Sequence, residues 1–357
     1  MPPAVPAAFL DACLRRPTSF TPIWLMRQAG RYMPEYRAVR ARLGFLELCK
    51  NPEAAAEVTL QPVERLGVDA AILFADILLV LEPLGVGLEF TRGDGPRIER
   101  PVRSAAGARA LPAVDVEDAV GFVFETVARA RKALADRVPL IGFAGAPFTL
   151  ASYLIEGGPS REFLLTKAFM RREPEAWAAM MTRLADVTAD YLNGQIAAGV
   201  QAVQLFDSWV GALSPADYRD FVLPHSRRVI GALRPGVPVI HFGVGTGGLL
   251  PLMKAAGGDV IGLDWRVELG PTWARLGPDV AVQGNLDPAV LLADVPAIRR
   301  AAREILDAAA GRPGHVFNLG HGIHKDTPVE HAKALVDIVH ELSARSSPLP
   351  REGKRAG

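Results

Sequence analysis

The chain has 357 residues, of which 49% are hydrophobic, so it can bury a core for one large α/β barrel or for two ordinary domains. A net charge of +1 excludes the broad basic field with which proteins bind nucleic acid or anionic membranes. The two cysteines, Cys13 and Cys49, are too few for a disulfide scaffold and predict a reducing, cytoplasmic compartment. Neither has a histidine at ligand spacing, so we expect no metal site.

An arginine-rich stretch follows the first apolar run, 22–26. It holds five arginines and, opposing them, only Glu35; the arginines are Arg27, Arg31, Arg37, Arg40 and Arg42. A guanidinium group is permanently charged and presents a planar fork that matches carboxylate or phosphate. In a nearly neutral chain, this stretch predicts a local anion-binding site.

Two of these arginines precede a helix, whereas the other three lie on it. Pro34 suits the first turn of a helix that runs toward Lys50. Arg27 and Arg31 come before it, on either side of Gly30, which permits a close backbone approach or an unusual backbone angle. We therefore assign the anion to Arg27 and Arg31 and interpret the remaining three as a solvated helix face.

Short apolar runs alternate with helical stretches along the chain. The runs are 22–26, 68–74, 138–143, 200–206, 237–242, 260–263, 280–283 and 316–319, and the helical stretches between them include 172–198, 215–233, 249–256 and 296–310. Runs rich in valine and isoleucine are typical of buried parallel strands. Eight alternations without hairpin signals predict a single-domain (β/α)₈ TIM-type barrel. An open doubly wound sheet is the alternative, because periodicity does not reveal whether a sheet closes.

Polar residues stand directly after most of these runs. In chain order the residues that follow the runs are Arg27, Asp76, Asp207 with Ser208, Gly243 just past His241, Asp264, Asn285 and His321. Barrel enzymes carry their chemistry at the carboxyl ends of the strands, so this distribution favours a site there. Ordinary turns also place polar residues after strands, so no single case decides.

The rest of the chain is assigned by composition. Residues 84–118 form a glycine- and proline-rich insertion that we expect to hold a small β-excursion over the barrel mouth. Residues 1–8 and 345–357 are predicted to be flexible tails around a barrel domain at 9–344. The uncharged stretch 138–155 is long enough to test as a membrane span, but its glycines and prolines predict a strand, a loop and a helix, so no membrane association is expected.

Four candidate side chains each have a structural alternative. Asp76 ends an apolar run and is either a helix N-cap or a carboxylate held in apolar surroundings. Tyr153, in a helix begun by Pro147, is either core packing or a site hydroxyl. Ser208 is a turn residue, a cap or a ligand contact, and it is not in the Gly-x-Ser-x-Gly pattern of serine hydrolases. His321 is structural or catalytic, and the glycines on both sides bring it close to whatever fills the barrel mouth.

The glycine-rich segment 243–248 follows a strand and contains the Gly-x-Gly-x-x-Gly pattern. The pattern could cradle phosphate, and Asp264 stands at the spacing of a ribose-binding acid. It comes after the fifth strand rather than opening a first βαβ unit, so we favour helix entry with close packing over nucleotide binding.

Two long segments resemble the signatures of a known family. The segment Trp-Leu-Met-Arg-Gln-Ala-Gly-Arg-Tyr-Met-Pro-Glu-Tyr-Arg at 24–37 looks like the amino-terminal signature of uroporphyrinogen decarboxylases. A second segment, Gly-Phe-Ala-Gly-Ala-Pro-Phe-Thr-Leu-Ala-Ser-Tyr-Leu-Ile-Glu-Gly-Gly at 142–158, resembles the other signature of that family. The resemblance runs in the same order from about residue 16 to about residue 342.

The resemblance implies roles for particular residues. Asp76 would face the centre of a cyclic tetrapyrrole and accept its pyrrole N–H groups, and Arg27 and Arg31 would act with it in catalysis. The implied substrate-binding set is Arg27, Gln28, Ala29, Gly30, Arg31, Asp76, Tyr153, Phe206, Ser208 and His321.

The implied reaction removes four acetate carboxyl groups from uroporphyrinogen III to give coproporphyrinogen III. It implies no metal and no organic cofactor, because a protonated pyrrole is itself an electron sink, and it implies a homodimer. The proton donor stays open between His321 and a substrate carboxyl held by an arginine, since free arginine is a poor acid. The order of acetate removal stays open as well.

Two other functions compete with this one. A cobalamin- or thiol-linked methyltransferase of the same superfamily would need a zinc site of His and Cys ligands, and both cysteines lie before residue 50. A non-catalytic tetrapyrrole carrier would not need the full set of polar residues described above. Both are therefore disfavoured.

Overall fold

A computed structural model describes residues 8–91 and 95–344 of the chain. The tails predicted from the sequence lie outside these residues, except for Ala8, which begins the first helix. The predicted boundaries of the barrel domain therefore stay predictions.

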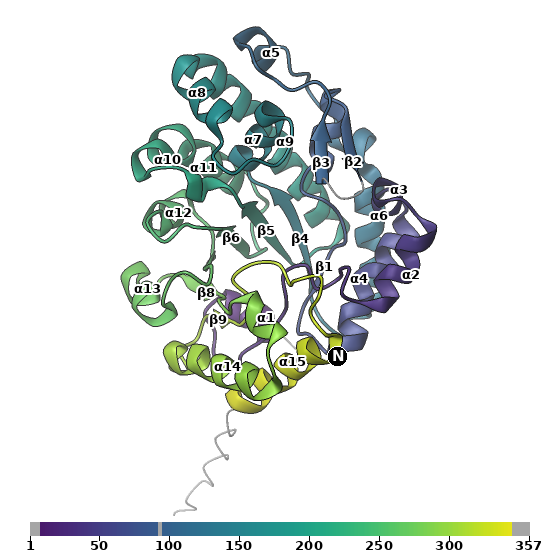
Figure 1. The fold of residues 1–357 in the computed structure, drawn as a ribbon, viewed down its shortest axis with the longest axis vertical. Helices are drawn as coiled ribbons and strands as arrows, with labels where there is room; N and C mark the ends of the chain where they lie inside the picture. The colour runs from purple at the N-terminus through teal and green to yellow at the C-terminus, as the bar shows by residue number, and fades with distance from the viewer. Residues whose placement is uncertain (1–7, 92–94, 345–357) are drawn as a thin grey trace, which may run out of the picture.

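A curled parallel sheet, ringed by helices, forms the centre of the described residues (Figure 1). Its strands follow the order β1-β4-β5-β6-β7-β8-β9, and each pairs in parallel with the next. They are β1 (Ala71–Ile72), β4 (Leu140–Gly145), β5 (Ala202–Asp207), β6 (Val239–Gly243), β7 (Val260–Gly262), β8 (Ala281–Gln283) and β9 (His315–Val316). Seven of the eight predicted runs thus overlap strands of this sheet, although the last run, 316–319, shares only Val316 with β9.

The eighth predicted run, 22–26, lies between β9 and β1 and links the two edges of the sheet. Ile23 forms a parallel bridge with Phe317, and the carbonyl of Ile23 accepts a hydrogen bond from Asp69 N at 2.8 Å. The run is not a regular strand, because side chains accept hydrogen bonds from its backbone: Ile23 N donates to Asp69 Oδ2 and Met26 N to Asn318 Oδ1. The chain therefore forms a TIM-type barrel whose first strand position is irregular.

Buried polar side chains cross the barrel interior. Trp24 Nε1 donates to Gln283 Oε1 at 2.9 Å, and Gln283 Nε2 donates to Gln204 Oε1 at 3.0 Å. Gln204 Nε2 also lies 3.7 Å from the sulfur of Met26. These amides satisfy one another, and they tie the irregular first run to β5 and β8.

The helices lie outside the strands (Figure 1). They are α1 (Ala8–Cys13), α2 (Pro34–Arg42), α3 (Phe45–Cys49), α4 (Pro52–Leu66), α5 (Ala105–Arg109), α6 (Val116–Leu134), α7 (Pro147–Glu156), α8 (Leu164–Arg172), α9 (Pro174–Ala198), α10 (Pro215–Phe221), α11 (Leu223–Gly231), α12 (Leu250–Ala256), α13 (Leu269–Leu276), α14 (Val295–Ala309) and α15 (Val329–Ser343), with 3₁₀ turns η1 (Leu79–Leu84), η2 (Val210–Ala212) and η3 (Pro288–Leu292). None of the helices in the described residues has the length and apolarity that crossing a membrane requires.

Local chemistry explains where the helix boundaries differ from those expected. The single helix expected from Pro34 toward Lys50 is divided into α2 and α3 at Gly44, whose N–H donates to the Glu47 carboxylate at 3.0 Å. The stretch expected as 215–233 is divided at Val222, because Pro224 at the start of α11 cannot donate to the preceding turn. The expectation of a strand, a loop and a helix across 138–155 is confirmed by β4 and α7.

The insertion contains a hairpin of β2 (Leu88–Thr91) and β3 (Gly95–Ile98), as expected. It packs against the end of α7: Ile98 N donates to Gly157 O at 2.9 Å, and Val102 N donates to Leu154 O at 2.8 Å. On its other side, the Phe90 ring lies 4.7 Å from that of Phe45 in α3. The hairpin therefore forms a wall between α3 and α7, and in Figure 1 it lies at the edge of the ring of helices.

Candidate active site

The loop after 22–26 places two arginines at the carboxyl end of the barrel strands, which we call the mouth. Arg27 has a left-handed backbone with φ of 61°, a conformation that L residues rarely adopt, and its side chain is exposed. The side chain passes over Gly322, where a Cβ would lie 2.5 Å from Cδ of Arg27. Arg31 is also exposed. Neither arginine has an ion-pair partner among the described residues, so both guanidinium groups are available to an anion.

The residues between these arginines hold the loop in place. Gln28 is fully buried, and its amide donates to Ala70 O and accepts from Leu25 N, both at 3.1 Å. Tyr32 donates its hydroxyl to Gln28 O at 2.6 Å. Gly30 is needed for a close approach, since a Cβ there would lie 3.1 Å from the carbonyl oxygen of Arg27. The side chain of Gln28 therefore supports the loop rather than pointing into the mouth.

The expected solvated face of α2 is only partly solvated. Arg42 is exposed. Arg37 is exposed too, but its Nη1 donates to the carbonyl of Arg31 at 3.1 Å, which braces the loop. Arg40 is half-buried, donates to Leu43 O and lies 5.6 Å from the ring of Phe45. The interpretation as a solvated helix face thus holds for Arg42 and is incomplete for Arg37 and Arg40. Helix periodicity does not show which backbone carbonyl a long side chain can reach.

Asp76 follows β1 and is half-buried at the mouth. Its Oδ1 accepts from Leu78 N at 2.9 Å and its carbonyl accepts from Leu79 N at 3.3 Å, so it caps the turn into η1. Burial raises the pKa of Asp76 to about 6, against the lowering effects of the Leu78 N–H and of Arg27. The capping alternative is therefore realised, and it leaves the second carboxylate oxygen without a hydrogen bond to any described residue.

Tyr153 from α7 lies within electrostatic reach of Asp76 and Arg27. Burial raises the pKa of its phenol, the carboxylate of Asp76 raises it further, and Arg27 opposes both. Its ring stacks on Trp209 with centroids 3.9 Å apart and an interplanar angle of 32°. The neighbour of Trp209 in sequence is Ser208, which is half-buried, so the end of β5 lies beside Tyr153.

Phe206 lies among aromatic rings at the same strand end. Its ring centroid is 5.6 Å from that of Phe143 on β4 and 6.0 Å from that of Phe242 on β6, both edge to face. Alternation along β5 then turns Asp207 to the outside of the barrel, where Thr149 Oγ1 donates to its carboxylate at 3.4 Å. Phe206 is therefore the apolar member of the candidate set.

His321 occupies the loop after β9, between two glycines. The edge of its ring lies against Trp265, with centroids 6.0 Å apart and an interplanar angle of 88°. Burial lowers its pKa, and the positive charge of Arg27 lowers it further. His321 is thus close to Arg27, and its surroundings disfavour the protonated imidazole.

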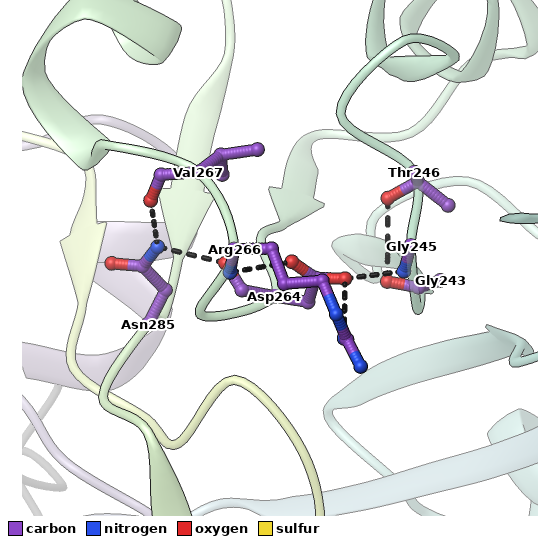
Figure 2. Close-up of polar contacts among 7 residues, drawn as sticks. All are labelled: Gly243, Gly245, Thr246, Asp264, Arg266, Val267 and Asn285. Atoms are coloured by element: carbon purple, nitrogen blue, oxygen red, sulfur yellow. Dashed lines mark hydrogen bonds and ion pairs between the residues drawn. The ribbon is translucent and has the colours of Figure 1, made fainter.

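The segment after β7 forms a polar network next to this loop (Figure 2). The buried carboxylate of Asp264 accepts from Gly245 N and, at 2.8 Å, from Arg266 N, and it lies 3.3 Å from Arg266 Nη1. Asn285 Nδ2 donates to the carbonyls of Asp264 and Val267 at 2.8 and 2.7 Å. The network fixes the ends of β6, β7 and β8 to one another.

The glycine-rich segment 243–248 takes part in this network instead of standing open. Gly245 gives its N–H to Asp264, as Figure 2 shows. At Gly243 a Cβ would lie 2.7 Å from Thr246 Cγ2 and 2.9 Å from Asp207 O. These contacts agree with close packing as the reason for the glycines.

The structure thus brings Arg27, Asp76, Tyr153 and His321 together at the mouth, with Phe206 and Ser208 on the adjacent strand end. Ala29 and Gly30 lie in the supporting loop. Neither Trp209 nor Arg266 was expected from the sequence to belong to the site. Both stand one or two residues beyond a noted polar residue, and only the folded contacts give them significance.

Comparisons with known proteins agree with this picture. A family model described as Uroporphyrinogen decarboxylase (URO-D) matches residues 6–342. A uroporphyrinogen decarboxylase of Carboxydothermus hydrogenoformans is 58% identical over 95% of this chain and 97% of its own length, and one of Sorangium cellulosum is 56% identical over the same shares.

Among solved structures, a methyltransferase from Methanosarcina mazei superimposes with a TM-score of 0.77 over 95% of this chain and 98% of its own. At 19% identity, this last likeness concerns the fold alone. With a family match over nearly the whole length and relatives above half identity, the chain belongs to the uroporphyrinogen decarboxylase family.

Proposed function

We propose that this chain converts uroporphyrinogen III to coproporphyrinogen III by removing four acetate carboxyl groups, a step of haem biosynthesis. The observation that carries the proposal is the carboxylate of Asp76 at the mouth, with Arg27 and Tyr153 within electrostatic reach. A polycarboxylate macrocycle needs positive groups for its carboxylates and a negative group for its inward-pointing N–H groups. Arg27 offers the first and Asp76 the second.

The chemistry requires no cofactor, because the pyrrole ring serves as the electron sink. A proton adds to the ring carbon beside the one that bears the acetate, which creates a ring cation. The bond to the carboxylate then breaks, CO₂ leaves, and the bonding electrons neutralise the cation as an exocyclic methylene. A second proton adds to the methylene carbon, and loss of the first proton restores the pyrrole with a methyl group.

In this scheme Asp76 stabilises the ring cation. Its pKa of about 6 leaves it ionised at pH 7 to 8 before substrate binds, and pyrrole N–H donors would lower that pKa further. A carboxylate fixed beneath a developing cation in partly buried surroundings is worth more than the same charge in water.

The remaining residues bind the rest of the substrate. Arg27 and Arg31 hold substrate carboxylates through their guanidinium forks. Tyr153, Ser208 and His321 offer hydrogen bonds, and Phe206 packs against the ring. Gln28, Ala29 and Gly30 act through the loop that they shape.

The lowered pKa of His321 bears on the proton donor. A neutral imidazole suits hydrogen bonding better than proton donation at neutral pH. We therefore assign His321 to substrate binding rather than to delivery of the first proton.

We further propose a homodimer in the cytoplasm. The cytoplasmic location rests on Cys13 and Cys49, which are both buried, free thiols. For the dimer, two exposed leucines of α8, Leu164 and Leu165, stand next to Phe163, whose ring lies 4.8 Å from that of Trp209. A facing subunit on this apolar surface would shield an oxidation-prone macrocycle, and twofold pairs are the commonest oligomers. Sedimentation at the monomer mass alone, at working concentration, would refute the dimer.

One experiment tests the function directly. The purified chain is incubated anaerobically with uroporphyrinogen III, and the products are oxidised and separated by carboxyl number. We expect porphyrins with seven, six, five and finally four carboxyl groups. Tight binding without loss of any carboxyl group would favour the carrier instead.

A further inference from the structure

Arg266, which follows β7, presents a guanidinium group that the proposed function has not used. Its side chain is 52% exposed, and its guanidinium carbon lies 3.8 Å from the centroid of the Trp265 ring. Nη1 lies 3.3 Å from Asp264 Oδ2, whereas Nε and Nη2 make no hydrogen bond with any residue in the described ranges. The aromatic face holds the group in place while part of its fork stays open.

The loop 320–322 connects this arginine to the rest of the site. At one end of the loop, a Cβ on Gly320 would lie 2.3 Å from Trp265 N. At the other end, Gly322 lies against the side chain of Arg27. His321, between them, has its ring edge on Trp265. Arg266 and Arg27 are thus joined by one short loop, and both positive charges contribute, after burial, to the lowered pKa of His321.

A simpler role for Arg266 would be that of a counter-ion for Asp264. The contacts of Asp264 make that role minor, because its carboxylate already accepts from two backbone N–H groups, those of Gly245 and Arg266. The pairing with Nη1 is long, at 3.3 Å, and the guanidinium side of the pair is half exposed to water, which weakens it. A buried carboxylate with two backbone donors does not need a guanidinium group that is stacked on a ring and half exposed.

The charge of the substrate supplies a reason for a third arginine. Uroporphyrinogen carries eight carboxylates around its rim, and one guanidinium fork binds one carboxylate in bidentate fashion. Arg27 and Arg31 stand together on one loop and cannot serve the whole rim. A pre-positioned guanidinium group on the far side of His321 loses little freedom when it binds, so it favours association.

We propose that Arg266 binds a peripheral carboxylate of the tetrapyrrole, across the 320–322 loop from Arg27, and so contributes to substrate affinity. The inference rests on the proposed function of the same site. It assigns Arg266 to binding rather than to bond breaking, so its removal changes KM and leaves kcat nearly intact.

The test compares Arg266→Gln and Arg266→Lys with Arg312→Gln as a matched control. Arg312 also lies over a tryptophan, with its guanidinium carbon 4.2 Å from the Trp273 ring, but it precedes β9 and so belongs to the opposite end of the barrel. We expect KM for uroporphyrinogen III to rise about five- to tenfold in Arg266→Gln, which is what loss of one exposed charge-assisted hydrogen bond produces. Arg266→Lys should lie between this variant and the wild type, because it keeps charge without the fork. Arg312→Gln should leave KM unchanged.

Two further measurements separate binding from a structural role. The KM of the wild type should rise with added salt more steeply than that of Arg266→Gln, since one ionic contact is missing in the variant. Inhibition by coproporphyrinogen III then identifies the carboxylate: a weaker inhibition constant in the variant indicates a propionate, and an unchanged one indicates an acetate. A KM within twofold of the wild type, or a fall in kcat at constant KM, would overturn the proposal.

Failure of this inference is distinguishable from failure of the proposed function. If the wild-type chain removes no carboxyl group, the function fails, yet Arg266 is still tested by the affinity of uroporphyrin, the oxidised octacarboxylate, measured by its fluorescence anisotropy. Weaker uroporphyrin binding by Arg266→Gln than by Arg312→Gln supports the carboxylate contact. Equal affinity of the two variants for uroporphyrin would refute the carboxylate contact of Arg266.

Discussion

Replacing Asp76 by asparagine should separate stability from catalysis. Burial raises the pKa of Asp76 from 3.8 to about 6, so the folded protein holds this carboxylate in its ionised form at a cost. At about 1.36 kcal/mol for each pH unit of that rise, the cost is roughly 3 kcal/mol. Partial exposure makes this figure an upper bound. The asparagine side chain carries no charge and keeps an oxygen for the Leu78 N–H, so the variant should be no less stable than the wild type.

The pH dependence gives the sign of the effect. A carboxyl group with a raised folded-state pKa contributes stability below pH 3.8 and loses it as the pH rises through about 6. The wild type bears this loss and Asp76→Asn does not. Between pH 5 and pH 8 the stability difference in favour of the variant should therefore grow by about 1.3 kcal/mol and then stay constant. Urea unfolding of the ligand-free protein at several pH values measures it.

Turnover should fall in Asp76→Asn even though the stability of the variant is equal to or above that of the wild type. If Asp76 stabilises the ring cation, the variant loses at least ~3 kcal/mol of transition-state stabilisation, which is more than a hundredfold in kcat/KM. Asp287→Asn is the matched control, because Asp287 caps η3 as Asp76 caps the turn into η1: its Oδ1 accepts from the N–H two residues on, at 2.9 Å. That control should stay active. A folded Asp76→Asn protein with near-normal turnover would refute the role of the charge.

Three further changes test other parts of the site. Arg27→Lys and Arg31→Lys should each lower kcat/KM about tenfold, with the exposed Arg42→Lys within about 0.5 kcal/mol of the wild type as the control; equal losses at all three would mean a diffuse basic field. Gly322→Ala should displace the Arg27 side chain, since its Cβ would lie 2.5 Å from Cδ, and it should reduce kcat/KM with little change in the thermal midpoint; full activity would show that Arg27 is free to move. Dialysis against strong chelators should leave turnover intact, because no cluster of three or more potential ligands occurs in the described residues, and activity restored only by zinc would revive the methyltransferase alternative.

The barrel was predictable because burial on both faces leaves a strong signal. Runs such as 200–206 and 237–242 overlap β5 and β6, with ends that differ by one or two residues. The run 22–26 was predictable as a strand position of the barrel, but its irregular backbone was not. Its ladder is interrupted because Asp69 and Asn318, far away in sequence, accept hydrogen bonds from its N–H groups. No local pattern contains that information.

The candidate site was predictable only in part, for a related reason. Arg27 and Asp76 each stand directly after a strand, so the barrel rule alone places them at one end. The effect of Arg27 on the pKa of Asp76 depends on the loop after 22–26 lying beside the end of β1, and the stacking of Tyr153 on Trp209 depends on the packing of α7 against β5. In the sequence, Arg266 is an ordinary loop residue. Its contact with the Trp265 ring and its lowering of the His321 pKa appear only in the folded structure.

Several features of the candidate site do not favour folding. Arg27 has a left-handed backbone, its guanidinium group has no counter-ion among the described residues, and Asp76 is ionised despite burial. Each of these costs would be offset by one ligand that has carboxylates on its rim and N–H donors at its centre. Such a ligand would pair the charges of Arg27 and Asp76 at the same time. Its binding energy would then act where charge develops during decarboxylation. If the proposed substrate binds here, the fold has already placed opposite charges where its carboxylates and its N–H groups would meet them, which is preorganisation.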